Sequence, residues 1–314
     1  MFMNTTKLTT LQGKIISQDK DALGFRWHAF WFSSLHANPS VNNSAVHMKR
    51  NLIFEEEKVR QKKLVPRIEK IEVKYFGQPE NTTLIMNKNL STPYNCSMHM
   101  SEMLTKRSVV ALVNGKPWDM HRPIEEDCEL QLLHFREIDP TVANKTFWRS
   151  CSLLLGMVAE KLFKDQYFVE PHSWPAVNVR SGSFVYDIDL HMGEWKPRQD
   201  ELRAMTLLMR KITYQDLVIE RLDIDSALAL ELFQDNKYKC RQIPQICEKT
   251  DSSSVTVYRV GKEYYDISKG PMMANTNQIG NCAIASVHLH QREDVLLHRF
   301  QGIAVPDTLP VCVI

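Results

Sequence analysis

The spacing of apolar residues changes several times along this chain between a period of two and a helical period, and this constrains its fold most. Residues 68–76 alternate between apolar and polar side chains, with Ile71, Val73 and Tyr75 on one face. Because successive side chains of a strand point to opposite faces, the stretch predicts a half-buried strand. The change of period along the rest of the chain predicts a mixture of strands and helices.

The dipeptide Asn114-Gly115 follows an apolar stretch at residues 109–113, which favours a strand. This dipeptide between two strands is a strong signal of a tight hairpin turn. A further strand is expected at residues 130–135, and a short helix at residues 97–104. One helix among several short strands is typical of a small α+β domain, which we place at residues 68–138.

Asp139-Pro140 marks the next boundary, because the residue before a proline avoids the helical region. Residues 141–164 then show a helical period. Its expected buried stripe consists of Trp148, Cys151, Leu155, Val158 and Leu162. Further expected elements are a strand at 184–190, a helix opened by Pro197, a helix capped by Asp225 and ending at Phe233, and strands near 255–257 and 283–289. They predict a second, larger α+β domain at residues 139–306.

The composition favours a folded protein with a sizeable core, since 43% of its residues are hydrophobic and 24% are charged. No run of about 18 apolar residues occurs, so no membrane-spanning helix is expected. The formal net charge is +2, so any contact with nucleic acid must come from local basic clusters. The seven cysteines include no Cys-x-x-Cys pair, which argues against a disulfide framework and a zinc site and favours reduced, buried thiols.

The two ends of the chain are less informative. Residues 1–45 are basic and rich in Ser and Thr, which weakly matches a mitochondrial presequence. The alternative is an N-terminal arm that lies on a partner, and the aromatic stretch Phe25–Phe32 could stack on bases or pack against a protein. Residues 307–314 form a short C-terminal tail.

The segment at residues 46–67 is locally basic and is the candidate RNA-binding region. A helix is expected from Asn51 to Leu64, with Pro66 ending it. The candidate RNA-binding residues are Lys49, Arg50, Lys58, Arg60, Lys62, Lys63, Arg67 and Lys70. A solvated linker helix explains the same pattern, and the sequence alone does not decide between the two.

Two sets of titratable residues could be read as sites. His288 and His290 share a strand face near His298, and Asp187, Asp189 and His191 alternate along another strand. Such patterns are more often solvent-facing residues than metal ligands or acid–base groups. We therefore expect neither a metal nor a cofactor.

Five stretches, in the same order along residues 68–306, resemble threonyl-tRNA synthetase. They are Leu112–Asp119 with Arg122-Pro123 and Asp127–Leu130, Phe147–Gly156, Glu220–Lys239, Val257–Met272, and Leu297–Gly302. The first is similar to the synthetase's TGS domain, a β-grasp module of several RNA-binding proteins. The others resemble its editing domain. The resemblance therefore implies a β-grasp domain followed by an editing-like α+β domain.

The chain departs from that family at the editing site. The family carries a His-x-x-x-His pair on the opening helix of this domain, and here those positions hold Arg149 and Leu153. It also carries a Cys and a His around Arg-Gly-Pro, and here these are Ser268 and Met272. Arg cannot act as a base near neutral pH, Leu has no polar atom, and Met is only a weak acceptor. We therefore expect no hydrolysis of mischarged tRNA, which needs titratable or metal-binding groups.

The chain ends at Ile314, before any aminoacylation core, so no aminoacylation is expected. This combination resembles a family of mitochondrial large-subunit ribosomal proteins built from the synthetase's TGS and editing-like domains. The resemblance implies a structural role in the mitochondrial matrix, with the large-subunit rRNA and neighbouring ribosomal proteins as partners. A free-standing tRNA deacylase and an RNA-binding regulator built on the TGS domain are the alternatives. Arg149 could hold a phosphate, although a structural arginine is the commoner case.

Overall fold

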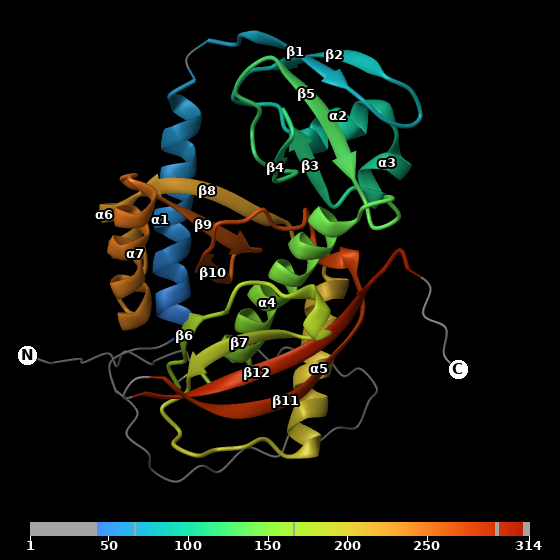
Figure 1. Cartoon of the computed structure of the whole chain (residues 1–314). Coiled ribbons are helices and arrows are strands. Elements are labelled where there is room, and N and C mark those ends of the chain that lie inside the picture. The colour runs from blue at the N-terminus through green and yellow to red at the C-terminus, as the bar shows by residue number, and fades with distance from the viewer. Residues whose placement is uncertain (1–42, 66, 166, 293–294, 310–314) are drawn as a thin grey trace, which may run out of the picture. The chain divides into compact units, whose positions relative to one another are not determined.

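The computed structural model describes residues 43–309, apart from residues 66, 166, 293 and 294 (Figure 1). All of them belong to one compact unit, His36–Ile314. The predictions on residues 1–42, Pro66 and Cys312 lie outside the described residues. Within the described part, no helix is both long and apolar enough to cross a membrane.

The first element is a long helix, α1 (Asn43–Lys63), which begins earlier than the predicted start at residue 51. Contacts from a distant part of the chain fix its beginning. The Asn43 side chain donates to the Tyr167 carbonyl at 2.7 Å, and Ser44 donates to the Asp165 carboxylate through its amide and its hydroxyl. The local sequence carries no signal of these contacts, which explains why the helix start was predicted too far along the chain.

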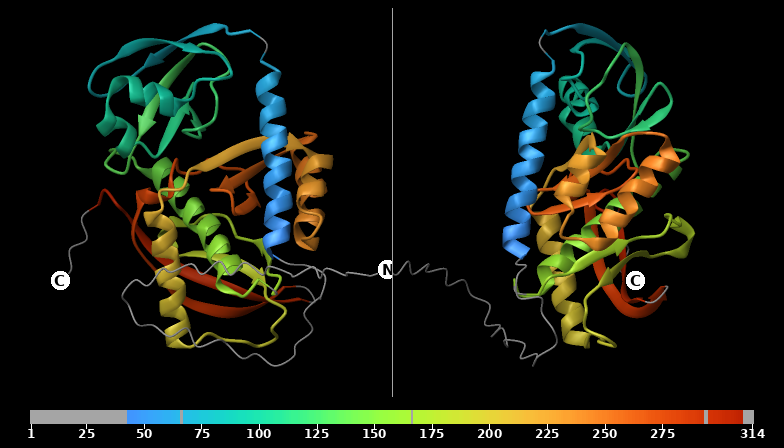
Figure 2. Two further views of the ribbon diagram at one scale, coloured as in Figure 1. Left: turned by 180° about the vertical axis from the view of Figure 1, so that it is seen from behind. Right: turned by 90° about the vertical axis from the view of Figure 1, so that its left-hand side faces the viewer.

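Helix α1 packs beside α6 (Ser226–Leu232) and α7 (Lys237–Thr250), as the two rotated views show (Figure 2). Its buried face includes Phe54, which joins the apolar cluster beneath these helices. Arg259 ties the same face down, because its Nη1 atom donates to Glu55 at 2.6 Å and to the Asn51 side chain at 3.1 Å. One side of the basic segment is therefore covered by the protein.

A five-stranded mixed sheet follows, in the order β2-β1-β5-β3-β4. Its strands are β1 (Lys70–Tyr75), β2 (Thr82–Asn87), β3 (Val110–Val113), β4 (Lys116–Trp118) and β5 (Cys128–Leu133). Strands β1 and β5 are parallel, and the other neighbours are antiparallel. The alternation predicted for residues 71–75 is confirmed, because every second residue of β1 is buried.

Two short helices contribute to the core of this sheet, where a single helix at 97–104 was predicted. They are α2 (Pro93–Met100) and α3 (Glu102–Arg107), and Ser101 separates them. Ser101 is both the C-cap of α2 and the N-cap of α3, and its hydroxyl accepts from the Leu104 amide at 3.4 Å. A serine at this position therefore ends one helix and begins the next.

The predicted hairpin at Asn114-Gly115 is confirmed. Both residues have positive φ, at 49° and 73°, as the tight turn between right-twisted strands requires. Val113 pairs with Lys116 across the turn. The turn leads into β4, so Trp118 lies on an edge strand of the sheet and Asp119 directly follows that strand.

The larger part of the unit holds two further antiparallel sheets. A four-stranded sheet has the order β11-β12-β7-β6, and a three-stranded sheet has the order β10-β9-β8. Their strands are β6 (Glu170–Ser173), β7 (Phe184–Asp189), β8 (Ile219–Asp225), β9 (Ser254–Val260), β10 (Tyr264–Ile267), β11 (Ile279–Arg292) and β12 (Val295–Pro306). Short 3-10 turns lie at Val179–Ser181 and Thr276–Gln278.

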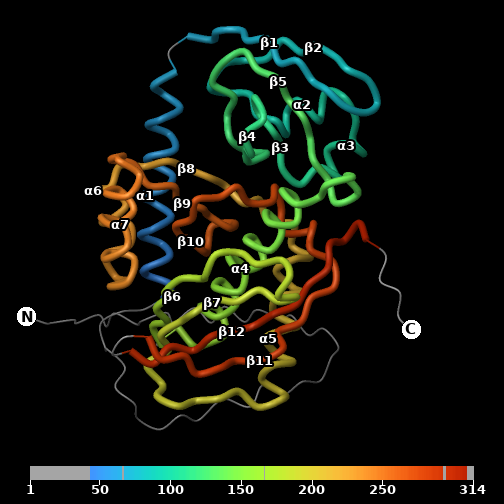
Figure 3. Tube along the Cα trace, in the orientation of Figure 1, coloured from blue at the N-terminus to red at the C-terminus, as the bar shows by residue number. Residues whose placement is uncertain are grey.

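Two helices pack on the four-stranded sheet (Figure 3): α4 (Thr141–Leu162) against β7, and α5 (Gln199–Tyr214) against β11. Of the predicted stripe on α4, the central members Cys151, Leu155 and Val158 are fully buried, and Trp148 and Leu162 are partly buried. Thiols contribute to the same core, and the six described cysteines are all free. Cys96 lies instead in the core of the five-stranded sheet, where burial raises the pKa of its thiol to about 12, as expected of an inert core cysteine.

The predicted cap at Asp225 is also confirmed, because its Oδ1 atom accepts from the Ala227 amide at 2.8 Å. The interpretation of Asp187 and Asp189 as solvent-facing is wrong. Both are buried. Asp187 receives two hydrogen bonds from Arg299, at 2.6 and 2.8 Å. The partner lies on β12, far along the chain, so alternation within β7 alone could not reveal it.

Candidate functional site

The structure brings Arg149 of α4 next to the loop that carries Ser268 and Met272. The Arg149 Nη1 atom donates to the Pro271 carbonyl at 2.8 Å. Arg149 is therefore in contact with the loop that the resemblance assigns to the same site. The contact also gives Arg149 a structural partner within the chain, and the hypothesis that it holds a phosphate gains no support.

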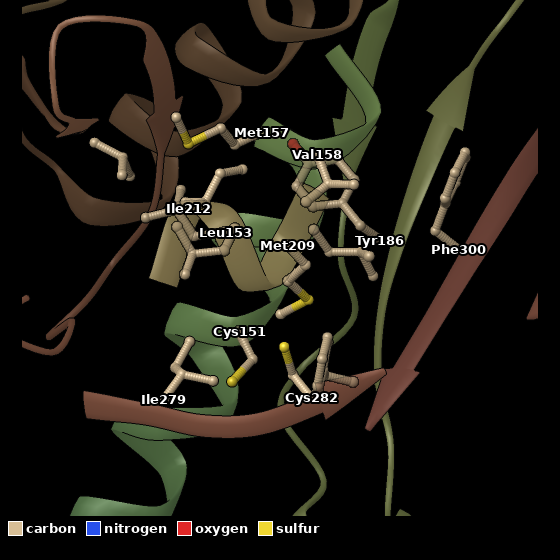
Figure 4. Close-up of a cluster of buried hydrophobic side chains, with 14 of the residues drawn as sticks. Cys151, Leu153, Met157, Val158, Tyr186, Met209, Ile212, Ile279, Cys282 and Phe300 are labelled. Carbon is tan, nitrogen blue, oxygen red and sulfur yellow. The ribbon is translucent and has the colours of Figure 1, made fainter. Parts of the chain in front are cut away.

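Leu153 and Met272 are core residues, and neither is exposed to solvent. Figure 4 shows Leu153 among the buried side chains around Met157, Met209 and Ile212. On the other side, the Ser150 hydroxyl lies 3.6 Å from the Met272 sulfur and accepts from the next amide of the loop at 2.9 Å. Neither position offers a group that can exchange a proton.

Ser268 is partly buried and serves the conformation of the loop. Its amide donates to the Thr256 carbonyl at 3.2 Å, and its hydroxyl accepts from the Gly270 amide at 3.3 Å. Gly270 has a φ of +66°, and a Cβ there would lie 1.8 Å from the Tyr258 hydroxyl. The loop therefore requires glycine, and among the described residues the Ser268 hydroxyl has no general base beside it that could activate it.

Asp119, which the sequence reading did not single out as a site residue, reaches this loop from the five-stranded sheet. It directly follows β4 and is 4% exposed. Its Oδ1 atom accepts from the Met272 amide at 2.8 Å and from the Tyr258 hydroxyl at 2.9 Å. Its Oδ2 atom accepts from Arg221 at 3.0 Å. Burial, followed by the Asp119 charge, raises the pKa of Tyr258.

A second buried carboxylate, Asp266, stands just before the loop. Lys239 forms an ion pair with it, and the hydroxyls of Tyr186 and Tyr264 donate to its Oδ2 atom at 2.5 and 3.0 Å. Burial and the Asp266 charge raise the pKa of both tyrosines. The Ile267 amide also donates to Asp266, at 2.7 Å. Donors of the protein itself therefore satisfy this carboxylate, which anchors the loop.

Glu170, Asp189 and His191 form the only group in the described part of the chain with the spacing of metal ligands. The ammonium of Lys237 lies 3.2 Å from both carboxylates and fills the position of a cation. The hydrogen bond that the His191 ring donates to the Glu170 carboxylate raises the pKa of His191. Burial acts to raise the pKa of Asp189, but hydrogen bonds from Tyr238 and its other neighbours bring it below its usual value. Glu170, Asp189 and His191 therefore form a polar network with Lys237 and Tyr238, in which the carboxylates are paired by groups of the protein itself.

The three histidines on β11 and β12 do not converge. Leu289 pairs with His298 across the strands, so His298 lies on the face opposite to His288 and His290. His298 is fully buried, whereas the His288 ring lies 2.7 Å from the Ser286 hydroxyl. This arrangement does not assemble a metal site from them.

The structure divides the predicted RNA-binding set. Arg50 is 2% exposed, with its Nη1 atom 3.7 Å from Glu160 and its guanidinium over the Phe233 ring, so it is withdrawn from that set. Four other members have partners within the chain: Lys49 contacts the Glu231 carbonyl, Lys58 pairs with Glu220, Arg60 with Glu57, and Lys70 with the Asn87 side chain.

Lys62, Lys63 and Arg67 are exposed, and no described residue forms an ion pair with any of them. They lie at the end of α1 and just beyond it. The cations that remain available to an outside anion are therefore concentrated at one end of the predicted segment.

Comparisons with known proteins agree on this architecture. The TGS domain family matches residues 81–134. The large ribosomal subunit protein mL39 of Drosophila melanogaster is 48% identical over 267 residues, which cover 84% of this chain and 80% of that protein. The cytoplasmic threonine–tRNA ligase 1 of Bos taurus is 31% identical over 221 residues, and a probable one of Dictyostelium discoideum is 31% identical over 234 residues. The matches cover 28% and 31% of the length of those ligases.

Proposed function

The chain belongs to the family of the large ribosomal subunit protein mL39, and on that premise we propose that it is a structural component of the mitochondrial large ribosomal subunit. It acts there without catalysis, and its partners are the rRNA and neighbouring ribosomal proteins. The 48% identity over most of both chains carries this proposal. The buried Leu153 and Met272 support it, because a hydrolytic site would need polar groups at these positions.

The proposed contact with rRNA is made by Lys62, Lys63 and Arg67. Proteins neutralise backbone phosphates with lysine and arginine, and these contacts position a protein without reading the base sequence. Cations already paired to carboxylates gain less from a phosphate, since they must first give up a partner. The three exposed residues therefore contribute more to the rRNA contact than Lys58 or Arg60. The proposed place of action is the mitochondrial matrix, where the ribosome works.

Charge reversal of these residues tests the rRNA contact. A full-length chain with Lys62, Lys63 and Arg67 changed to Glu is expected to reach the large subunit several-fold less than the unchanged chain, because three attractions become repulsions. The measurement is the fraction of tagged chain in the large-subunit peak after sedimentation of mitochondrial lysate. A matched control changes the exposed Arg198, Arg203 and Lys211 around α5 to Glu.

Equal incorporation of the two variants would contradict the assignment of these three residues. Absence of the unchanged chain from the large-subunit peak would contradict the proposed function itself and favour an RNA-binding regulator. The deacylase alternative has its own readout. Catalysis would be shown to persist if the purified chain hydrolyses seryl-tRNA and the Asp266→Asn chain does not.

A further inference from the structure

A groove of about 790 Å³ lies where three parts of the chain meet. The last turns of α1 form one wall and the first residues of β8 another. The five-stranded sheet unit supplies the third wall through the loops at residues 89–92 and 121–125. This volume lies within the roughly 300–1,000 Å³ typical of pockets that enclose small organic ligands. The groove adjoins the exposed cations at the end of α1.

The charges that line the groove favour an anion. Its three acidic residues are each neutralised from within: Glu220 pairs with Lys58, Asp223 with Arg221, and Glu125 with Arg122. Lys62 also lines the groove and has no ion-pair partner among the described residues. Arg60 lines it too, and its partner Glu57 is not part of the lining. The groove therefore carries surplus positive charge at the α1 wall.

Arg122 lines this groove. Its guanidinium carbon lies 3.5 Å from the centre of the Trp118 ring, so the guanidinium rests against the face of the indole. The Trp118 indole Nε1 donates to the Arg122 carbonyl at 3.1 Å, which fixes the two residues to each other. The Arg122 side chain remains 25% exposed. Unpaired RNA bases stack on aromatic rings and on arginine planes, so this held guanidinium suits a base.

We propose that the groove holds an unpaired nucleotide of single-stranded RNA, with its base against Arg122 and its phosphate at Lys62. This inference rests on the proposed ribosomal role and adds the form of RNA recognised. Stacking tolerates any base, so no sequence preference follows. Double-stranded RNA is not expected to use the groove, because a paired base cannot leave its helix without losing its partner. The apolar residues Leu64, Leu90 and Pro123 supply contact area beside the base.

The test measures binding of the purified full-length chain to two labelled probes: a short, unstructured single-stranded RNA of mixed sequence, and a duplex of the same sequence. Arg122→Lys keeps the charge and removes the plane. It is expected to weaken single-strand binding about fivefold or more, the lower end of what base stacking contributes, and to leave duplex binding unchanged. The matched control is Arg203→Lys, which alters another arginine that pairs with an acidic residue three positions away.

A second variant guards against an effect of Arg122→Lys on folding. Lys62→Ala, at an exposed position, is expected to weaken single-strand binding and to lower its salt dependence. With 4-thiouridine in the single strand, photocrosslinks are expected within residues 118–125. Unchanged affinity in both variants, or crosslinks only outside the groove, would overturn the inference.

A measurement on the assembled particle separates the groove from the proposed function. The unchanged chain is expected to sediment with the large subunit, where crosslinking from residues 118–125 should reach RNA. Crosslinks to a ribosomal protein in the assembled particle would show that a protein segment occupies the groove, and the inference would be wrong while the structural role stands. Absence of the unchanged chain from the particle would instead remove the proposed function.

Discussion

The buried carboxylate of Asp119 offers the sharpest test of how this protein is held together. It joins the five-stranded sheet unit to the loop that carries Met272, through the Met272 amide, the Tyr258 hydroxyl and Arg221. Asp119→Ala removes all three acceptor contacts in one change. It should therefore destabilise the chain far more than the loss of an exposed carboxylate.

The structure sets the size of the effect. Removing one partner of a buried ion pair costs about 3–5 kcal/mol when the other charge is left unpaired. Arg221 keeps three hydrogen bonds to Asp223, at 3.0, 3.1 and 3.3 Å, so its charge stays paired. The Met272 amide and the Tyr258 hydroxyl lose their acceptor, and each buried donor without a partner costs about 1–3 kcal/mol. We therefore expect the two unpaired donors together to lower the free energy of unfolding by about 3 kcal/mol, near the lower end of their summed cost.

The assay is urea unfolding of the full chain, which yields the free energy of unfolding. The control is Asp127→Ala, because Asp127 is exposed and accepts from the Glu72 amide at 2.8 Å. Its expected cost is below about 1 kcal/mol. Tyr258→Phe removes one of the three donors, and in the double variant with Asp119→Ala it should add little. Equal costs for the two aspartate variants, or full additivity of the double variant, would refute the reasoning.

Two further predictions concern stability. A Cβ at Gly156 would lie 2.1 Å from the Tyr264 hydroxyl, which Asp266 holds in place, so Gly156→Ala should cost about 1–3 kcal/mol by overpacking. A thermal unfolding midpoint that does not fall would show that Tyr264 yields easily. Burial lowers the pKa of His172 from 6.5 to about 4, so the folded state binds fewer protons in this window and loses stability as the pH falls through it. His172→Phe preserves packing on Tyr238 and should flatten the loss between pH 7 and pH 4.5, and equal slopes in the two chains would contradict this.

Local patterns predicted the local elements well. The alternation at Ile71, Val73 and Tyr75, the turn at Asn114-Gly115 and the cap at Asp225 depend on neighbours within a few residues. Contacts between distant segments decided the rest. Asp187 resembles a solvent-facing residue until Arg299 of β12 pairs with it, and no pattern within one strand contains that information.

The candidate site divides in the same way. The resemblance assigns Arg149 to one site with the loop of Ser268 and Met272, and the structure places the Arg149 guanidinium against the Pro271 carbonyl of that loop. The basic pattern before residue 68 did not show which side of α1 is covered. Arg50 was therefore predicted to bind RNA, whereas its side chain is buried against Glu160 and Phe233.

The way the polar groups around the loop are satisfied bears on function. A site that acts on an outside substrate must keep donors or acceptors open toward it, at a cost in stability that other contacts offset. Here Arg149 donates to the Pro271 carbonyl, Asp266 is enclosed by Lys239 and two tyrosines, and Asp119 accepts from the loop itself. With these groups engaged and Leu153 in the core, the loop joins two parts of the protein firmly. A firm joint suits a component that must present fixed surfaces to an assembly, and we propose that binding falls to the groove and the cations at the end of α1.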